Sequence, residues 1–240
     1  MASTFRLLST ANAKIMKGQA FGYLTTILHL APSWLSGRNV CPMATEECAA
    51  DCLNTTGNGN YPNTKAARLR KTLHYFNSHE VFMAELVADV QALVKMAAKK
   101  NMVPAIRLNG TSDLRFENDA VTVDGVEYKN IMTAFPTLIW YDYTKIPNRR
   151  NVPSNYHLTF SRSGKNDADC KKILKSGGNV AIVYGTKKGK SLPNSWNGYP
   201  VIDGDLTDLR FLDAKGVVVG LRAKGKAQGK GSESGFVLAV

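Results

Sequence analysis

The sequence contains no apolar run long enough to cross a membrane. Its longest apolar stretch, residues 21–30, is interrupted by glycine, threonine and histidine, and it falls well short of the ~20 residues that a membrane-spanning helix needs. The first twenty residues also contain no continuous apolar segment of the kind found in secretory signals. We therefore expect a cytoplasmic protein with no membrane partner.

Cysteine is scarce, with only 4 cysteines in 240 residues. Disulfides are rare in a reducing compartment, where clustered cysteines more often bind metal or act chemically. Cys41, Cys48 and Cys52 form a C-x6-C-x3-C pattern. No C-x2-C pair is present, which argues against the usual zinc sites. Three thiolates on one short loop can hold three corners of a [4Fe-4S] cluster, so we predict these residues as ligands. Zinc ligation, or thiols with no ligand role, are the alternatives.

Cys170 is distant from the other three cysteines in the sequence. We predict it as the fourth ligand, because a cluster held entirely by the protein needs four thiolates. The alternative is a lone buried cysteine, since cysteine is among the most buried residue types. Four thiolates favour electron transfer, redox sensing or a structural role, whereas three leave one iron open to a ligand.

Basic residues exceed acidic ones, with 31 Lys and Arg against 19 Asp and Glu and a net charge of +12. Most of this excess lies between Lys145 and the C-terminus, and it suits a polyanionic partner such as nucleic acid. The candidate phosphate-binding residues are Arg68, Arg70, Lys71, Lys187, Lys188 and Lys190, and the candidate stacking residues are Tyr141, Tyr143 and Trp196. Solvated basic surfaces that bind no nucleic acid are the alternative.

Short apolar runs alternate with helical segments along most of the chain. Strands are predicted at residues 21–30, 103–108, 137–143, 156–160, 179–184, 199–202 and 217–221, and helices at residues 64–76, 79–100, 127–134 and 167–175. This alternation predicts an α/β fold with a parallel sheet, arranged as a partial (β/α) barrel whose Cys-rich loop follows the first strand. We expect a single domain over residues 1–240, with a flexible Gly/Lys-rich segment at residues 223–235 and a final edge strand.

The run Arg107-Leu-Asn109-Gly-Thr-Ser-Asp113 leaves a predicted strand in a polar turn. In a parallel sheet this strand end faces the ligand crevice, where Arg107, Asn109 and Asp113 could orient a polar ligand. A turn held by hydrogen bonds from the Asn and Asp side chains to the backbone is the alternative.

The segments 39–57, 67–72 and 107–113 together resemble a family of largely uncharacterised bacteriophage proteins that includes an iron-sulfur protein of a lytic podovirus. The resemblance implies a [4Fe-4S] cluster, a barrel like that of radical S-adenosylmethionine (SAM) enzymes, and expression in the cytoplasm of an infected bacterium. Radical enzymes of that class usually carry C-x3-C-x2-C, so the cysteine spacing of this chain departs from theirs.

These features give three hypotheses about function. The first is a [4Fe-4S] phage protein with a redox or electron-transfer role and a redox or host-protein partner. The second is a radical-SAM-like enzyme that uses SAM at an open cluster iron. The third is a basic nucleic-acid-binding protein in which the cluster is structural.

Overall fold

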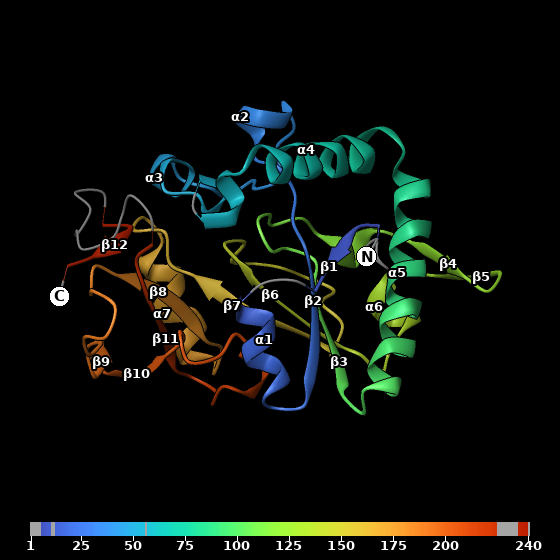
Figure 1. Ribbon diagram of the computed structural model, residues 1–240. Coiled ribbons are helices and arrows are strands. Elements are labelled where there is room, and N and C mark those ends of the chain that lie inside the picture. The colour runs from blue at the N-terminus through green and yellow to red at the C-terminus, as the bar shows by residue number, and fades with distance from the viewer. Residues whose placement is uncertain (1–5, 11–12, 56, 225–234, 240) are drawn as a thin grey trace. The chain divides into compact units, whose positions relative to one another are not determined.

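The computed structural model describes residues 6–10, 13–55, 57–224 and 235–239 (Figure 1). The chain folds into two compact units, each built from three separate segments. Unit 1 comprises residues 1–42, 65–142 and 149–157, and unit 2 comprises residues 43–64, 143–148 and 158–240. The units interleave along the chain with no linker between them, so composition alone offers no signal of this division. The prediction of one domain stays a prediction.

Unit 1 contains a mostly parallel sheet with the strand order β1-β2-β3-β6. Its strands are β1 (Leu8–Ser9), β2 (Tyr23–Leu28), β3 (Val103–Arg107) and β6 (Ile139–Thr144), whose last two residues belong to unit 2. β1 pairs antiparallel with β2, whereas β2, β3 and β6 run parallel. The sequence predicted the three parallel strands, but β1 is too short to show a period of its own.

The two long helices of unit 1 lie where helices were predicted, whereas its two N-terminal helices were not predicted. The helices of this unit are α1 (Ala13–Gln19), α2 (Ser33–Ser36), α4 (Pro62–Asn77, whose first three residues belong to unit 2), α5 (His79–Lys99) and α6 (Ile131–Ala134). The predicted apolar stripe of α5 is buried, from Phe82 through Leu86 and Val90 to Ala97. Residues three or four apart share one face of a helix, so this spacing directs the stripe into the core.

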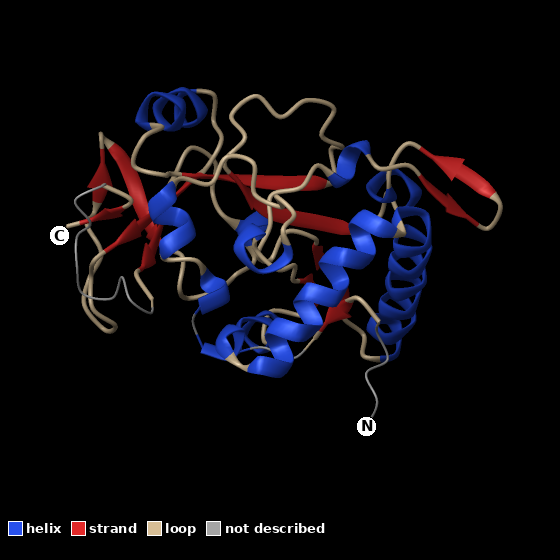
Figure 2. Ribbon diagram, turned by 90° about the horizontal axis from the view of Figure 1, so that it is seen from above, coloured by secondary structure: helices blue, strands red, loops and turns tan. Residues whose placement is uncertain are grey.

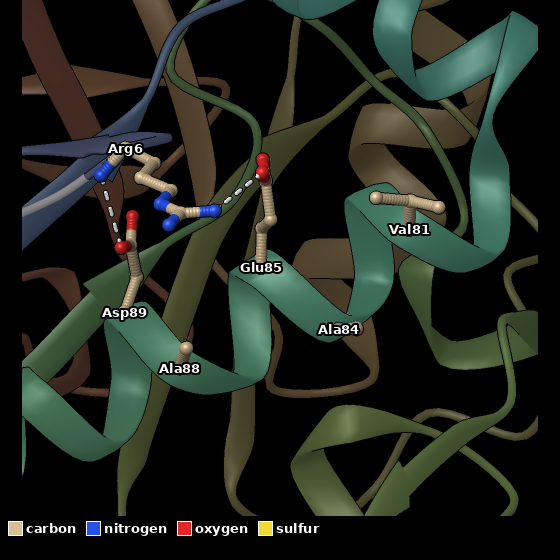
Figure 3. A pocket seen from close by; sticks show the side chains of 6 residues that line it. All are labelled: Arg6, Val81, Ala84, Glu85, Ala88 and Asp89. Carbon is tan, nitrogen blue, oxygen red and sulfur yellow. Dashed lines mark hydrogen bonds and ion pairs between the residues drawn. The ribbon is translucent and has the colours of Figure 1, made fainter.

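The N-terminal segment is fastened to α5 by one buried carboxylate. Asp89 accepts hydrogen bonds from the backbone N–H groups of Arg6, Leu7 and Leu8 at 2.7–3.0 Å. The Arg6 side chain bonds Glu85 one turn away on the same helix (Figure 3). A shallow hollow beside these residues is also lined by Val81, Ala84 and Ala88. The carboxylates of Glu85 and Asp89 in this hollow both accept hydrogen bonds from the protein itself, so we assign the hollow a structural role.

The predicted helix at residues 127–134 is wrong over its first half. Val126–Tyr128 forms β5, which pairs antiparallel with β4 (Val121–Val123), and only Ile131–Ala134 is helical. Asp124 and Gly125 join the two strands with positive φ angles of 51° and 81°. A two-residue turn of this kind favours Asp-Gly and specifies a hairpin, a signal that the sequence analysis overlooked. Figure 2 shows the hairpin extending beside α5.

The strands of unit 2 are also mostly parallel, in the order β7-β8-β11-β10-β9. The strands are β7 (Tyr156–Ser161, whose first two residues belong to unit 1), β8 (Val180–Tyr184), β9 (Ser195–Trp196), β10 (Tyr199–Asp203) and β11 (Val218–Arg222). β12 (Val237–Leu238) pairs parallel with the end of β8, as the predicted final strand requires. Unit 2 also contains α3 (Glu46–Ala50) and α7 (Asp167–Lys175).

The fold class is therefore mixed α/β with mostly parallel strands, as predicted. The strands that the structure describes form no closed barrel, because β1 pairs only with β2 and β9 pairs only with β10, which leaves both as edge strands. Most of the predicted flexible segment, residues 225–234, lies outside the described residues.

Candidate functional site

Two of the clustered cysteines lie on a short structured segment of unit 2. Cys48 is in α3, where the Thr45 hydroxyl caps the helix by accepting a hydrogen bond from the Cys48 N–H at 3.2 Å. Cys52 follows two residues after the helix ends. Its Sγ atom lies 3.5 Å from the Asn54 backbone N and 3.6 Å from the Asn54 Nδ2, and both donate to it. N–H donors aimed at sulfur are typical of cluster-binding cysteines, where they tune the potential.

The segment with Cys48 and Cys52 is attached to the carboxyl end of the unit 2 sheet. Glu47 Oε1 lies 3.7 Å from Lys165 Nζ, in the loop that joins β7 to α7. The backbone N–H of Glu47 and its partner Thr45 hold the pKa of the Glu47 carboxyl below its usual range. This places α3 near the loop that follows a parallel strand, where ligands of α/β proteins bind.

Cys41 lies at the corresponding end of the sheet in unit 1. Its Sγ donates to the Thr111 carbonyl at 3.8 Å, and its N–H donates to Asn39 Oδ1 at 2.9 Å. Thr111 belongs to the loop after β3, and its hydroxyl bonds the backbone of Leu30 after β2. Cys41 is half-buried, as are Cys48 and Cys52.

The fourth cysteine has a different environment. Cys170 is fully buried in the apolar cluster of unit 2, between α7 and the sheet. Burial raises the pKa of its thiol to about 12, and the carboxylate of Asp167 adds to this rise. The thiol lies 3.7 Å from Asn166 Oδ1. An apolar site disfavours the thiolate that a metal ligand must be, so these contacts favour packing, the alternative named for Cys170.

The four cysteines form no disulfide bonds. In the part of the chain that the structure describes, no three His, Cys, Asp or Glu side chains are gathered closely enough to hold a metal ion. Thiolate ligands commonly come together only on the metal itself, because binding and local folding are coupled. Three half-buried thiols, one on the short helix α3 and two on loops, fit an iron-sulfur cluster in the chemistry of their donors, and one of them already receives N–H donors.

The predicted crevice residues Arg107, Asn109 and Asp113 are all buried in unit 1. Asn109 holds the turn after β3: its Oδ1 accepts from the Leu114 N–H and the Ser112 hydroxyl, both at 2.8 Å. Asp113 pairs with Arg149 at 3.0 Å. Asn109 therefore makes the side-chain-to-backbone contact expected of a turn, the alternative named for this segment, whereas the Asp113 carboxylate pairs with an arginine 36 residues away.

Arg107 belongs to a buried polar network that the sequence analysis missed. Its Nε lies 3.5 Å from Asp142 Oδ1, and its guanidinium lies 5.6 Å from the ring centroid of Tyr141. The Tyr156 hydroxyl and the Leu108 N–H both donate to Asp142 Oδ2 at 3.0 Å. Burial raises the pKa of Asp142 to about 6, against the opposing charge of Arg107. The sequence did contain one signal for this network, because Asp142 is the one charged residue in the largely apolar and aromatic β6.

A second buried ion pair lies beside this network. Arg149 Nε and Nη2 bond the two carboxylate oxygens of Glu117 at 2.6 and 2.7 Å, and the guanidinium stacks on the Tyr156 ring at 5.5 Å. Neither Glu117 nor Arg149 stood in a recognisable motif. Their pairing depends on loops that are 32 residues apart in the sequence.

The predicted phosphate-binding residues fall into three kinds. Lys71 is largely buried and donates to the Leu7 carbonyl at 2.5 Å, and this burial lowers its pKa. Arg68 is half-buried and Arg70 is exposed. The lysines of the loop after β8 are all exposed in unit 2, at positions Lys187, Lys188 and Lys190. Of the predicted stacking residues, Tyr141 is fully buried, so it does not present a stacking surface.

Fold and site together define a mixed α/β protein with a half-buried cysteine segment at the carboxyl ends of parallel strands. Residues 6–239 match the family model described as Gene product 88, and the chain belongs to this phage-type family. Comparison with curated proteins and with solved structures found no significant match. Among the described residues, no helix has the length and apolar character needed to cross a membrane.

Proposed function

We propose that this protein binds a [4Fe-4S] cluster through Cys41, Cys48 and Cys52 and acts in one-electron chemistry. The observation that carries the proposal is the Cys52 thiol, which is half-buried and receives two N–H donors from Asn54. Such donors stabilise a sulfur that carries negative charge, as a metal-bound thiolate does. When bound, a cluster of this type supplies reversible one-electron transfer.

The residues of the chain have separate tasks in this proposal. Thr45 caps α3 and thereby orients Cys48, while the Glu47–Lys165 pair keeps α3 at the sheet end. The loop after β3 holds Cys41 through Thr111. We assign Cys170 to the core and not to the cluster, because its burial opposes ionisation.

A cluster with three protein ligands is also compatible with the second hypothesis, a radical-SAM-like enzyme. Its fourth iron would take a ligand from outside these three cysteines, and SAM is one such ligand. For such an enzyme, the more specific description of the fold would be a partial barrel of the radical-SAM type. The parallel strands of each unit, with cysteines at their carboxyl ends, support this description.

The test is anaerobic purification with iron and sulfide supplied, followed by iron analysis and absorption spectroscopy. We expect a brown protein with broad absorption near ~400 nm from thiolate-to-iron charge transfer. Cys48→Ser and Cys52→Ser should lose most of the iron. Cys170→Ala is the matched control and should keep it.

Two results would overturn the proposal or part of it. A colourless protein that carries zinc would remove the cluster altogether. A folded Cys170→Ala variant without iron would show that Cys170 is the fourth ligand, and the site would then be closed to SAM.

A further inference from the structure

We propose that an exposed face of unit 1, formed by α2 and residues 65–77 of α4, binds single-stranded nucleic acid. This α2–α4 face is defined by Trp34, Leu35, Arg38, Arg70 and Leu73. The inference is independent of the cluster, and it concerns a part of the chain outside the C-terminal region that carries most of the excess charge.

Three contacts fix α2 and the residues around it along α4. The Ala31 N–H donates to the Thr72 hydroxyl at 2.8 Å. Arg38 Nη2 donates to Asn77 Oδ1 at 3.2 Å, and the Arg38 guanidinium lies 5.5 Å from the Phe76 ring centroid. These contacts place Ala31 and Arg38 beside the second half of α4, and Figure 1 shows α2 next to α4.

The face presents an indole ring to solvent. Trp34 is 55% exposed, whereas Trp140 is fully buried in the core. Leu35 and Leu73 are also exposed, at 38% and 36%. An exposed aromatic ring provides a stacking platform for a base, which is how proteins bind single strands without reading their sequence.

The two segments that form this face carry charged side chains of one sign. Residues 31–42 and 65–77 contain no Asp or Glu, and their basic residues are Arg38, Lys65, Arg68, Arg70 and Lys71. Lys71 is occupied by the Leu7 carbonyl. Within the described residues, no carboxylate pairs with Arg38 or Arg70. Arg38 follows Trp34 by four residues, and Arg70 belongs to α4, along which residues 31 and 38 are held. These arginines and the exposed indole together complement a strand whose phosphates and bases alternate.

A nucleic acid fits this face better than an anionic membrane does. Helices that lie in a membrane surface bury a long apolar stripe, whereas α2 has only four residues and the face exposes only three large apolar side chains. Stacking and phosphate pairing need no more than the groups present here. The occupant we infer is therefore single-stranded DNA or RNA.

The experiment is a titration of the full chain with a fluorescein-labelled oligothymidylate, by anisotropy, at several salt concentrations. The logarithm of affinity should fall linearly with the logarithm of salt concentration. Arg38→Gln with Arg70→Gln should reduce the magnitude of that slope by about 0.7 for each phosphate that no longer has an arginine beside it. Trp34→Leu should weaken binding roughly fivefold to a hundredfold with little change in slope, because stacking is not ionic. Trp34→Leu should also remove the quenching of tryptophan fluorescence that the oligonucleotide causes.

The matched control replaces Lys187, Lys188 and Lys190 together with glutamine, which removes more charge from a different exposed loop. We expect this variant to bind nearly as tightly as the wild-type chain. Weaker binding by the lysine variant with normal binding by the arginine variant would move the site away from the α2–α4 face. No binding at low salt would overturn the proposal, as would preferential binding to phosphatidylserine vesicles. Circular dichroism melting of each variant confirms that it is folded.

Discussion

The Tyr156 hydroxyl donates a 3.0 Å hydrogen bond to a carboxylate, Asp142, that is completely buried. The same carboxylate faces Arg107 and accepts from the Leu108 backbone at the end of β3. This network joins β6 to the loop after β3 within unit 1.

Asp142→Asn should change how stability depends on pH. Burial raises the pKa of Asp142 from 3.8 to about 6 in the folded chain, so between these values the folded state binds more protons than the unfolded state. The contribution of Asp142 to the free energy of unfolding is therefore largest below pH 4. It is lost as pH rises through 6, by up to about 3 kcal/mol. The measurement is urea unfolding of both proteins from pH 4.5 to 7.5.

Asp124→Asn, in the exposed turn between β4 and β5, is the control for Asp142→Asn. The free-energy difference between the wild-type chain and Asp142→Asn should shrink as pH rises, whereas that for Asp124→Asn should stay flat. A constant difference for Asp142→Asn would show that its pKa is not raised.

The four cysteines should differ in reactivity in the folded, cluster-free chain. Cys170 should react with iodoacetamide more than about a hundredfold more slowly than a free cysteine, because the thiolate is the nucleophile and burial raises its pKa to about 12. Cys41, Cys48 and Cys52 are half-buried and should be labelled first. Peptide mass spectrometry over time measures the four rates, and labelling in urea should remove the difference. Early labelling of Cys170 in the folded chain would contradict its place in the core.

Asn54→Ala should lower the reduction potential of the cluster if the cluster is bound as proposed. The variant removes the Nδ2 donor to Cys52 Sγ and leaves the backbone donor in place. Fewer N–H donors to sulfur make the reduced, more negative state less favourable. Redox titration followed by electron paramagnetic resonance gives the potential. Asn58→Ala, an exposed residue of the same segment, should leave it unchanged, and equal potentials in both variants would mean that the Asn54 side chain does not act on the cluster.

Asp89→Asn should destabilise unit 1 by about 2 kcal/mol or more. Three backbone N–H groups donate to this buried carboxylate, and hydrogen bonds to a charged group are stronger than neutral ones. Glu85→Gln is the control, because its partners Arg6 and His74 are both side chains in contact with solvent, and it should cost less than about 1 kcal/mol. Chemical denaturation measures both values. Similar losses for the two variants would argue against the anchoring role of Asp89.

Periodicity in the sequence determined most of the regular elements. Alternate apolar and helical segments predicted β2, β3, β6, β7 and β8, and the stripe from Phe82 to Ala97 predicted α5. These elements can be predicted from the local sequence, because apolar residues recur at a different spacing in a strand and in a helix. The hairpin at Asp124 and Gly125 was also readable, since its turn chemistry is local.

Only the tertiary structure decided which polar residues are buried. From the sequence, we predicted Cys170 as a ligand and Lys71 as a phosphate-binding residue. In the structure, Cys170 packs in the core of unit 2 and Lys71 bonds the Leu7 carbonyl. Asp142 and Tyr156 are 14 residues apart along the chain and Glu117 and Arg149 are 32 apart, and each pair meets only in the folded unit. The sequence therefore determined the elements and the chemical groups available, while the environment of each group depended on long-range packing, because desolvation and pairing act through space and leave no local pattern.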